Sequence, residues 1–176
     1  MDKTAFITGA TSGFGRAALQ RFVAGGWRVV ATGRRAERLA ALVAEHGADR
    51  VHAAAFDIRD ADAMGAALAA LPEGFRDIDL LVNNAGLATP GSLLTAGPDE
   101  LQRQLDVNVT AVLHLTRAVL PGMIDRGRGA VVNVSSIAGF LPGPGSAVYY
   151  AGKAFVLSLT EALHDELSPR GIRVTC

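Results

Sequence analysis

The sequence is poor in the residues that would point to a disulfide, a metal or a nucleic acid. Its one cysteine is Cys176, so no internal disulfide can form, which fits a reducing compartment. Its four histidines are scattered, with no cysteine or carboxylate pattern around them, and we predict no metal site. The 17 basic and 17 acidic side chains balance, and no run of lysine and arginine suggests a nucleic-acid surface.

Long apolar runs are also missing. No segment approaches the ~20 consecutive apolar residues of a membrane span. The first residues have neither the basic region nor the apolar stretch of a secretory signal. We therefore expect a cytoplasmic protein with no membrane partner and no nucleic-acid partner.

The sequence does contain enough apolar material for a large core. Of its 176 residues, 49% are hydrophobic and 19% are charged, which predicts one globular domain over residues 1–176. Short runs that are apolar on both faces alternate with amphipathic stretches, which indicates an α/β fold: a Rossmann-type, doubly wound parallel sheet with helices on both faces. The predicted strands are Thr4–Thr8, Arg28–Thr32, Val51–Phe56, Ile78–Val82, Ala130–Val134 and Ile172–Cys176, and the predicted helices are Phe14–Ala24, Ala36–Glu45, Asp60–Ala70, Pro98–Gly127 (broken near its start and bent at Pro121) and Tyr149–Leu167.

A glycine-rich segment lies between the first predicted strand and the first predicted helix, where a phosphate would meet the N-terminus of the helix. Gly9 permits a tight turn, Gly13 lets the backbone approach a pyrophosphate, and Gly15 lets the helix pack close to the strand. Three glycines can also form an ordinary turn, but their place in a βαβ unit favours a dinucleotide site. The candidate cofactor-binding residues of this turn are Gly9, Thr11, Ser12, Gly13, Phe14 and Gly15.

The ends of the second and third predicted strands suggest which dinucleotide. An acidic residue after the second strand is typical of NAD binding, whereas this sequence has Arg34 and Arg35 there. A guanidinium suits the 2′-phosphate of NADP, so we predict NADP(H), although two solvated arginines remain an alternative. After the third strand, Asp57-Ile58 offers a carboxylate to the adenine amino group, or only a helix-capping or turn aspartate.

Further candidates follow the fourth and fifth strands, because ligands of such sheets bind beyond the carboxyl ends of the strands. The segment Asn83-Asn84-Ala85-Gly86 has small residues that let a ribose lie against the backbone, and Asn83, Ala85 and Gly86 are candidate cofactor contacts. The alternative is a structural turn, which we favour for Asn84. Ser135 and Ser136 bring hydroxyls to the same edge, and we favour a turn role for Ser135.

Tyr149 and Lys153 are four residues apart in a predicted helix, so they share one face. An ammonium beside a phenol favours the phenolate, which lowers the pKa of the phenol toward working pH, as general acid–base catalysis requires. By itself such a pair is most often ordinary surface and core.

Taken together, the motifs resemble the short-chain dehydrogenase/reductase family. The resemblance rests on Gly9, Gly13 and Gly15, on Asn83-Asn84-Ala85-Gly86, on Asn108, and on Ser136 thirteen residues before Tyr149-x-x-x-Lys153. It implies a catalytic tetrad of Asn108, Ser136, Tyr149 and Lys153. In that family Tyr149 would transfer the proton of the substrate oxygen, Ser136 would orient that oxygen, and Asn108 would anchor a water that leads to solvent. Lys153 would lower the pKa of Tyr149 and, with Tyr149, hold the nicotinamide ribose.

The resemblance also bears on substrate and assembly. The first half of the sequence is similar to NADP-dependent 3-hydroxy acid (serine-type) dehydrogenases, whereas residues 142–155 are similar to a broader set of short-chain oxidoreductases. A secondary alcohol or carbonyl substrate is implied, and a homodimer or homotetramer formed through helices near 101–126 and 149–167. The chain ends inside its sixth predicted strand, so the family's substrate lid and seventh strand are expected after Cys176. The alternative function is a non-catalytic NADP-binding sensor or scaffold.

Overall fold

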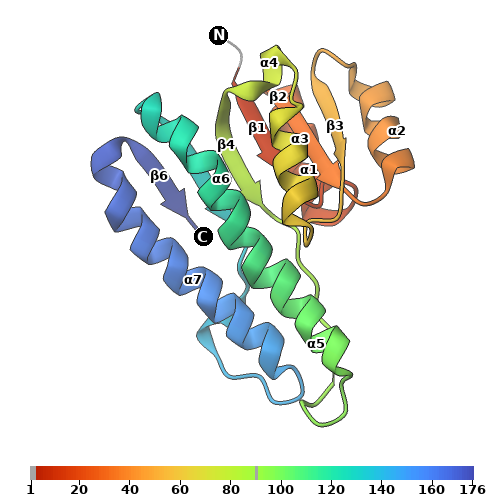
Figure 1. Cartoon of the computed structure of the whole chain (residues 1–176), viewed down its shortest axis with the longest axis vertical. Coiled ribbons are helices and arrows are strands. Elements are labelled where there is room, and N and C mark those ends of the chain that lie inside the picture. Colours follow the sequence, from red (N-terminus) through yellow and green to blue (C-terminus); the bar gives the residue numbers. More distant parts are fainter. Residues whose placement is uncertain (1–2, 90) are drawn as a thin grey trace.

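In the computed structural model, which describes residues 3–89 and 91–176, one all-parallel sheet runs through the molecule (Figure 1). Its strand order is β3-β2-β1-β4-β5-β6, so the chain moves outward in one direction from β1 and then in the other from β4. The predicted doubly wound α/β fold is confirmed. The strands are β1 (Thr4–Ile7), β2 (Arg28–Gly33), β3 (Val51–Ala55), β4 (Ile78–Asn83), β5 (Gly129–Asn133) and β6 (Ile172–Thr175).

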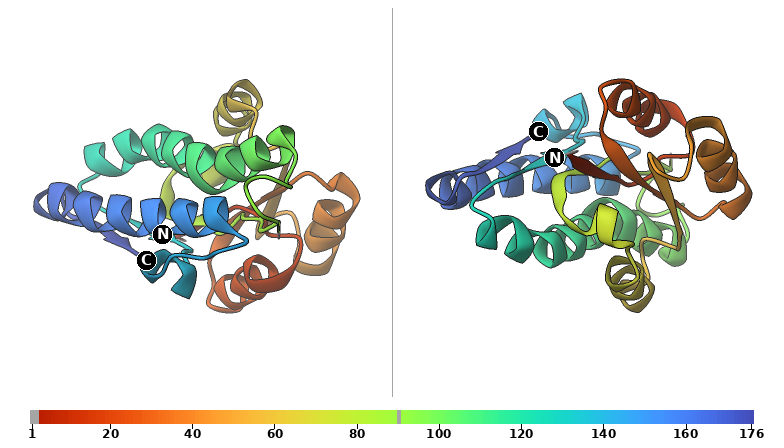
Figure 2. Two further views of the ribbon diagram at one scale, coloured as in Figure 1. Left: turned by 90° about the horizontal axis from the view of Figure 1, so that it is seen from below. Right: turned by 90° about the horizontal axis from the view of Figure 1, so that it is seen from above.

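Helices cover the two faces of this sheet (Figure 2), where α1 and α6 lie on opposite sides. They are α1 (Gly13–Ala24), α2 (Ala36–His46), α3 (Ala61–Ala69), α4 (Glu73–Arg76), α5 (Pro98–Leu105), the π-helical η1 (Asp106–Thr110), α6 (Ala111–Asp125), the 3₁₀ turn η2 (Ile137–Phe140), α7 (Ala147–Leu167) and the 3₁₀ turn η3 (Ser168–Arg170).

The alternation of side chains along each strand divides the core in two. Ala5 and Ile7 of β1 pack with Leu19 of α1 and Leu39 of α2. Phe6, between them, packs on the other face with helices α3, α6 and α7. Each of these side chains is fully buried, and burying one of the larger ones contributes about 1.5–3 kcal/mol. Both faces of β1 therefore need apolar residues, which is why its sequence, Thr-Ala-Phe-Ile, carries no charge.

The long predicted helix 98–127 is one helical run with a local change of winding. Its first part is α5, its last part is α6, and η1 between them is π-helical. The expected break is thus a π turn that contains Asn108, and such turns occur frequently at functional sites. Pro121 lies inside α6.

The segment Pro98–Asp125 is long and apolar enough to cross a membrane by length and composition alone. In the structure, Leu115, Val119 and Met123 of this segment lie in the core against the sheet. A core helix passes the same test, and the buried face identifies this segment as one.

The helix α1 approaches the end of β1 very closely at Gly15. A Cβ atom at this position would lie 2.4 Å from the carbonyl oxygen of Gly9 and 2.5 Å from Nδ2 of Asn84. The first of these atoms is backbone and cannot move aside without distorting the turn. Only glycine fits, as the sequence predicted.

We therefore expect Gly15→Ala to lower the free energy of unfolding by about 1–3 kcal/mol, the usual cost of overpacking. The matched control is Gly65→Ala in α3, where a Cβ would meet nothing within 4 Å. That substitution should raise stability by about 0.5–1 kcal/mol, because alanine favours a helix. Urea denaturation measures both, and equal effects of the two substitutions would contradict the packing argument.

Candidate active site

A cavity of about 390 Å³ lies at the carboxyl edge of the sheet, where the connections that follow β1 and β4 leave in opposite directions. This is the switch point at which doubly wound folds bind their ligands. Most of the predicted cofactor-binding residues line it, namely Gly9, Thr11, Ser12, Arg34, Arg35, Asp57, Ile58, Ala85 and Gly86. Gly13, Phe14, Gly15, Asn83, Tyr149 and Lys153 are not among the residues that line it.

The turn after β1 is shaped by two glycines in the left-handed region, Gly9 with φ +66° and Gly13 with φ +53°. Gly13 opens α1, and a Cβ there would meet nothing within 4 Å, so the backbone of this turn is accessible. The N-terminus of α1 offers free backbone N–H groups and the positive end of its dipole to an anion. The side chain of Phe14 is 84% exposed, so its contribution to this site would come from its backbone.

The ends of β1 and β4 are held together by side chains. Oγ1 of Thr8 accepts hydrogen bonds from the backbone N–H groups of Asn84, at 2.9 Å, and Ala85, at 2.8 Å. Nδ2 of Asn84 donates in return to the carbonyl oxygen of Thr8, at 2.8 Å. Asn84 thus has the structural role that we favoured, and it also lines the cavity. These bonds join the start of the glycine turn to the Ala85-Gly86 segment.

Arg35 is oriented across the cavity toward the same turn. Its Nη2 donates to Oγ1 of Thr11, at 2.8 Å, and to Oγ of Ser12, at 3.4 Å. These partners are neutral, so the charge of Arg35 is not compensated by them. Gly33 makes this approach possible, since a Cβ there would lie 3.1 Å from Cγ2 of Thr11.

Asp57 is engaged by Arg59, a residue that the sequence analysis did not single out. Nη2 of Arg59 lies 2.7 Å from Oδ2 of Asp57. The hydrogen bonds from Arg59 hold the pKa of Asp57 below its ordinary value, so this carboxylate is ionised at neutral pH. Arg59 could have been found from its position two residues after Asp57, the reach of a local side-chain pair.

Asn83 lies in the interior of the protein, away from the cavity. It is 3% exposed, and its Nδ2 donates to Oγ1 of Thr116, at 3.0 Å, and to Oδ1 of Asn133, at 2.8 Å. Asn133 donates onward to Thr160 of α7, at 2.9 Å. Asn83 therefore ties β4 and β5 to the helices behind them, and we assign it this structural role in place of the predicted cofactor contact.

Two of the four predicted catalytic residues meet beside Gly86. A Cβ atom on Gly86 would lie 3.2 Å from Oδ1 of Asn108 and 3.5 Å from Nζ of Lys153. Both side chains are buried, at 1% and 5% exposure. Asn108 donates to the carbonyl oxygen of Leu87, at 2.7 Å, and accepts from its N–H, at 3.0 Å. Asn108 thereby fixes the backbone that follows Gly86.

Lys153 connects α7 to the end of β5. Its Nζ donates to the carbonyl oxygen of Val134, at 2.7 Å, and lies 5.9 Å from the centre of the Tyr149 ring. Burial lowers the pKa of Lys153, because the charged form loses its hydration. Tyr149 is half-buried and precedes Lys153 by one turn of α7, so the predicted shared helix face is present.

Ser136 lies at the N-cap of η2, where its Oγ accepts from the N–H of Ala138, at 3.2 Å. The turn η2 packs against α7. Ser135 donates to the carbonyl oxygen of Lys153, at 3.0 Å, so it anchors α7, a long-range contact in place of the turn role that we favoured. The two serines therefore differ. The side chain of Ser135 bonds the backbone of α7, whereas that of Ser136 caps the N-terminus of η2.

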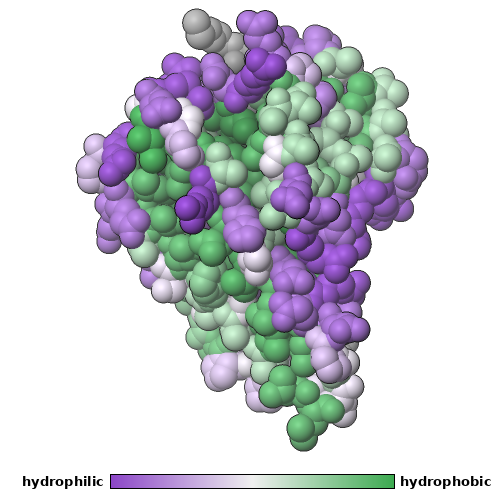
Figure 3. Space-filling view, in the orientation of Figure 1, coloured by the Kyte–Doolittle hydropathy of each residue, from purple (hydrophilic) through white to green (hydrophobic). Residues whose placement is uncertain are grey.

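Beyond the two strand ends, the loops after β4 and β5 meet, since the N–H of Gly91 donates to the carbonyl oxygen of Gly145, at 2.9 Å. They expose apolar side chains, among them Leu94 and Phe140. Figure 3 shows hydrophobic surface at the lower end of the molecule.

The residues present fit a dinucleotide and give no sign of a metal. Across residues 3–89 and 91–176, no group of three or more metal-ligating side chains comes together. The glycine turn, the accessible N-terminus of α1 and the guanidiniums at the cavity are suited to phosphates. A doubly wound sheet with this turn at its switch point defines a nucleotide-binding α/β protein.

Comparison with known proteins makes this assignment specific. Residues 3–176 match the family profile described as short chain dehydrogenase. The chain therefore belongs to the short-chain dehydrogenase family, and the resemblance inferred from the sequence is confirmed. It follows that the chain is an oxidoreductase that acts on a small molecule.

Three relatives illustrate the similarity. A sulfoacetaldehyde reductase of Chromohalobacter salexigens is 52% identical over 99% of this chain and 70% of its own length. A serine 3-dehydrogenase of Rhizobium radiobacter is 50% identical over 99% of this chain and 70% of its own length. The closed form of a serine dehydrogenase complexed with NADP⁺ superposes with a TM-score of 0.93 at 41% identity, over 97% of this chain and 69% of that one.

The two hydrogen bonds between Asn108 and Leu87 should contribute to the stability of the fold. Asn108→Ala leaves the N–H and the carbonyl of Leu87 without these partners, and we expect it to lower the free energy of unfolding by about 1–3 kcal/mol. The control is Gln102→Ala, which removes an exposed amide bonded to Asp106 on the same helical run, at 2.8 Å. It should change stability by less than about 0.5 kcal/mol. Chemical denaturation measures both variants. An unchanged midpoint for Asn108→Ala would contradict a stabilising role of the two hydrogen bonds between Asn108 and Leu87.

Proposed function

We propose that residues 1–176 form one NADP(H)-binding domain of an oxidoreductase that transfers hydride between nicotinamide and a secondary alcohol or carbonyl. The observation that carries the proposal is the meeting of Asn108 and Lys153 at Gly86, at the end of a cavity that begins at the glycine turn. A hydride-transfer site needs its proton-transfer group beside the nicotinamide end of the cofactor site. In this chain the helix that carries Tyr149 and Lys153 and the cavity for the cofactor would provide these two parts at one edge of the sheet.

The cofactor is NADP(H). Relatives include NADP-dependent 3-hydroxy acid dehydrogenases and structures determined with NADP⁺ or NADPH. In this chain Arg34 and Arg35 line the cavity where an acid would otherwise bind a ribose 2′-hydroxyl. Arg35 in particular lies between the second strand and the glycine turn, and its planar fork suits a phosphate.

The bound cofactor would supply the hydride at nicotinamide C4. The residues of the chain would position the cofactor and the substrate and would exchange a proton with the substrate oxygen. Tyr149 would exchange a proton with the substrate oxygen, and Ser136 would hold that oxygen by a hydrogen bond. Lys153, fixed by Val134, would present its ammonium to Tyr149 and to the ribose. Asn108 would hold Lys153 and the Gly86-Leu87 backbone in register. Both ends of its amide already bond Leu87, so anchoring the expected water would use its remaining acceptor capacity.

The substrate class that we propose is a small 3-hydroxy acid or the corresponding carbonyl. Relatives near 50% identity carry the names serine 3-dehydrogenase and sulfoacetaldehyde reductase, which refer to small compounds with a carboxylate or a sulfonate group. The competing function, an NADP-binding sensor without catalysis, is less well supported because Tyr149 and Lys153 are both present and share a helix face.

For the whole protein we propose a cytoplasmic homodimer or homotetramer. Leu105 and Leu113 on the helical run α5–α6 and Phe155 on α7 are exposed apolar side chains at 38%, 43% and 39%. Burying them between copies would be favourable. Light scattering on the purified protein checks this, and a monomer at micromolar concentration would refute it.

The test of the chemistry is Tyr149→Phe, which removes one hydroxyl and keeps the ring. We expect turnover of NADPH with a panel of small aldehydes and 3-oxo acids to fall by at least about 100-fold, as for the loss of a general acid–base. NADPH affinity should fall far less, because only one contact with the ribose is lost. The control is Tyr150→Phe, which should retain activity. Absorbance at 340 nm follows the reaction. A parent protein that binds NADPH tightly and reduces none of the carbonyls would favour the sensor function.

The test of the cofactor is Arg35→Ala. We expect the parent to bind NADPH more tightly than NADH, and the variant to lose about tenfold or more of that preference, since a charge-assisted bond to phosphate contributes about 1.5–3 kcal/mol. Titration calorimetry with both nucleotides measures the ratio, with Arg38→Ala on the exposed face of α2 as control. Equal affinities of the parent for the two nucleotides would refute the phosphate role.

A further inference from the structure

Four arginines line the cavity, and they differ in what their guanidinium groups already bind: Arg34, Arg35, Arg59 and Arg103. Arg59 and Arg103 are each paired with a carboxylate, Asp57 and Glu100, both at 2.7 Å. Among the residues that the structure describes, Arg34 and Arg35 have no such ion pair within 4.0 Å. The four therefore offer two kinds of contact. Arg59 and Arg103 are neutralised by ion pairs, whereas Arg34 and Arg35 have none at this distance, and Arg34 acts on Asp57 only at longer range.

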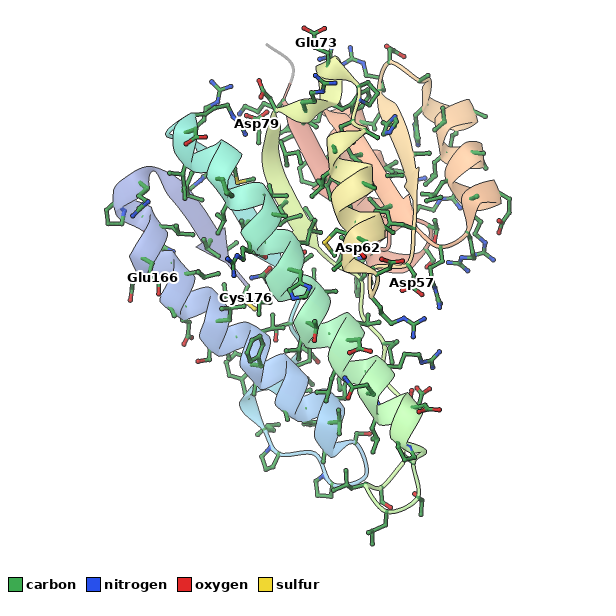
Figure 4. All side chains as sticks on the ribbon, in the orientation of Figure 1. Asp57, Asp62, Glu73, Asp79, Glu166 and Cys176 are labelled. Carbon is green, nitrogen blue, oxygen red and sulfur yellow. The ribbon has the colours of Figure 1, made fainter. Side chains whose placement is uncertain are left out.

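The ion pair of Arg59 with Asp57 is close and holds the guanidinium group of Arg59 in one orientation. Nε of Arg59 lies 3.0 Å from Oδ1 and 3.2 Å from Oδ2 of Asp57, and Nη2 lies 2.7 Å from Oδ2. The N–H of Arg59 donates to the same carboxylate, at 3.1 Å. One edge of the guanidinium is thereby used, and Figure 4 places Asp57 at the carboxyl edge of the sheet. A ligand in the cavity can meet the flat faces of Arg59 and its remaining Nη1 edge.

The charges around Arg59 argue against a phosphate there. Asp57 is ionised, and Asp106 at the start of η1 also interacts electrostatically with Arg59. Arg34 also acts electrostatically on Asp57. The charge of Arg59 is already neutralised by its ion pair with Asp57, which makes Arg59 a weaker site for a further anion than Arg35. A flat, immobilised guanidinium is well suited to stack on an aromatic ring. Ile58, Leu87 and Val107 line the same cavity and give it an apolar part that fits a flat base.

We propose that Arg59, held flat by Asp57, is the platform on which the adenine ring of the cofactor stacks, while Arg34 and Arg35 bind the 2′-phosphate. This inference rests on the proposed function. It also changes the role of Asp57. Both carboxylate oxygens are occupied by Arg59, so Asp57 is a positioning residue that acts on the adenine through Arg59, in addition to any bond with the adenine amino group.

The experiment uses titration calorimetry with NADPH, NADH and adenosine 2′,5′-bisphosphate. All three contain adenine, and only NADH lacks the 2′-phosphate. We expect Arg59→Ala to weaken all three by the same factor, about fivefold to thirtyfold, the size of a stacking contact with a cation. The NADPH-to-NADH ratio should stay at the parent value. Arg59→Lys keeps the charge and the partner Asp57 but not the plane, so it should weaken binding as much as Arg59→Ala.

The control is Arg128→Ala, which removes an arginine paired with Asp79, at 3.5 Å, at the opposite edge of the sheet (Figure 4). It should leave all three affinities unchanged. Thermal unfolding of every variant separates loss of the contact from loss of the fold.

Three results would overturn the platform: weakening of the two ligands with a 2′-phosphate alone, parent-like affinity in Arg59→Lys, or parent-like affinity in a folded Arg59→Ala. A parent protein that does not bind adenosine 2′,5′-bisphosphate would instead contradict the proposed function, and the platform with it.

Discussion

The site depends on the bond between the ends of β1 and β4. Thr8 accepts from two consecutive backbone N–H groups after β4, and Asn84 donates back to Thr8. Adjacent strands whose connections leave in opposite directions create a crevice, and these bonds set its width. Gly15 must be glycine for the same reason, because Asn84 and the Gly9 carbonyl fill the space of its side chain. The turn that would receive the pyrophosphate and the segment that would receive the ribose are therefore bonded directly to each other.

The second half of the site depends on buried polar contacts between β5 and α7. Lys153 bonds Val134, Ser135 bonds the carbonyl of Lys153, and Asn133 bonds Thr160. A buried polar group that loses its partner costs about 1–3 kcal/mol, so these contacts strongly favour one position of α7 along β5. Tyr149 and Lys153 are thus carried by a helix whose register is fixed at the strand end. A proton-transfer group needs this precision, because its reach is one hydrogen bond.

Most of the secondary structure could be predicted from the sequence. Strand and helix ends were predicted within about two residues, because apolar runs and amphipathic periods record burial directly. The short helix α4 was missed, since the four residues Glu73–Arg76 contain no periodicity. Asn83 was predicted to contact the cofactor, whereas in the structure its side chain bonds Asn133. That partner is fifty residues away in the sequence, and only the register of the sheet brings the two together. Arg59 was overlooked because an arginine in a loop is ordinarily solvated, although its position two residues after Asp57 is within the reach of a local side-chain pair.

The central claim is that one edge of the sheet holds an NADP molecule from its 2′-phosphate at β2 to its nicotinamide beside Gly86. A crystal structure of the protein with NADP⁺ tests it most directly. The account predicts the 2′-phosphate against Arg34 and Arg35, the pyrophosphate at the N-terminus of α1, and the nicotinamide ribose within hydrogen-bond reach of Lys153. A cofactor bound with its nicotinamide away from Gly86 and Tyr149, or with its 2′-phosphate away from both arginines, would contradict it.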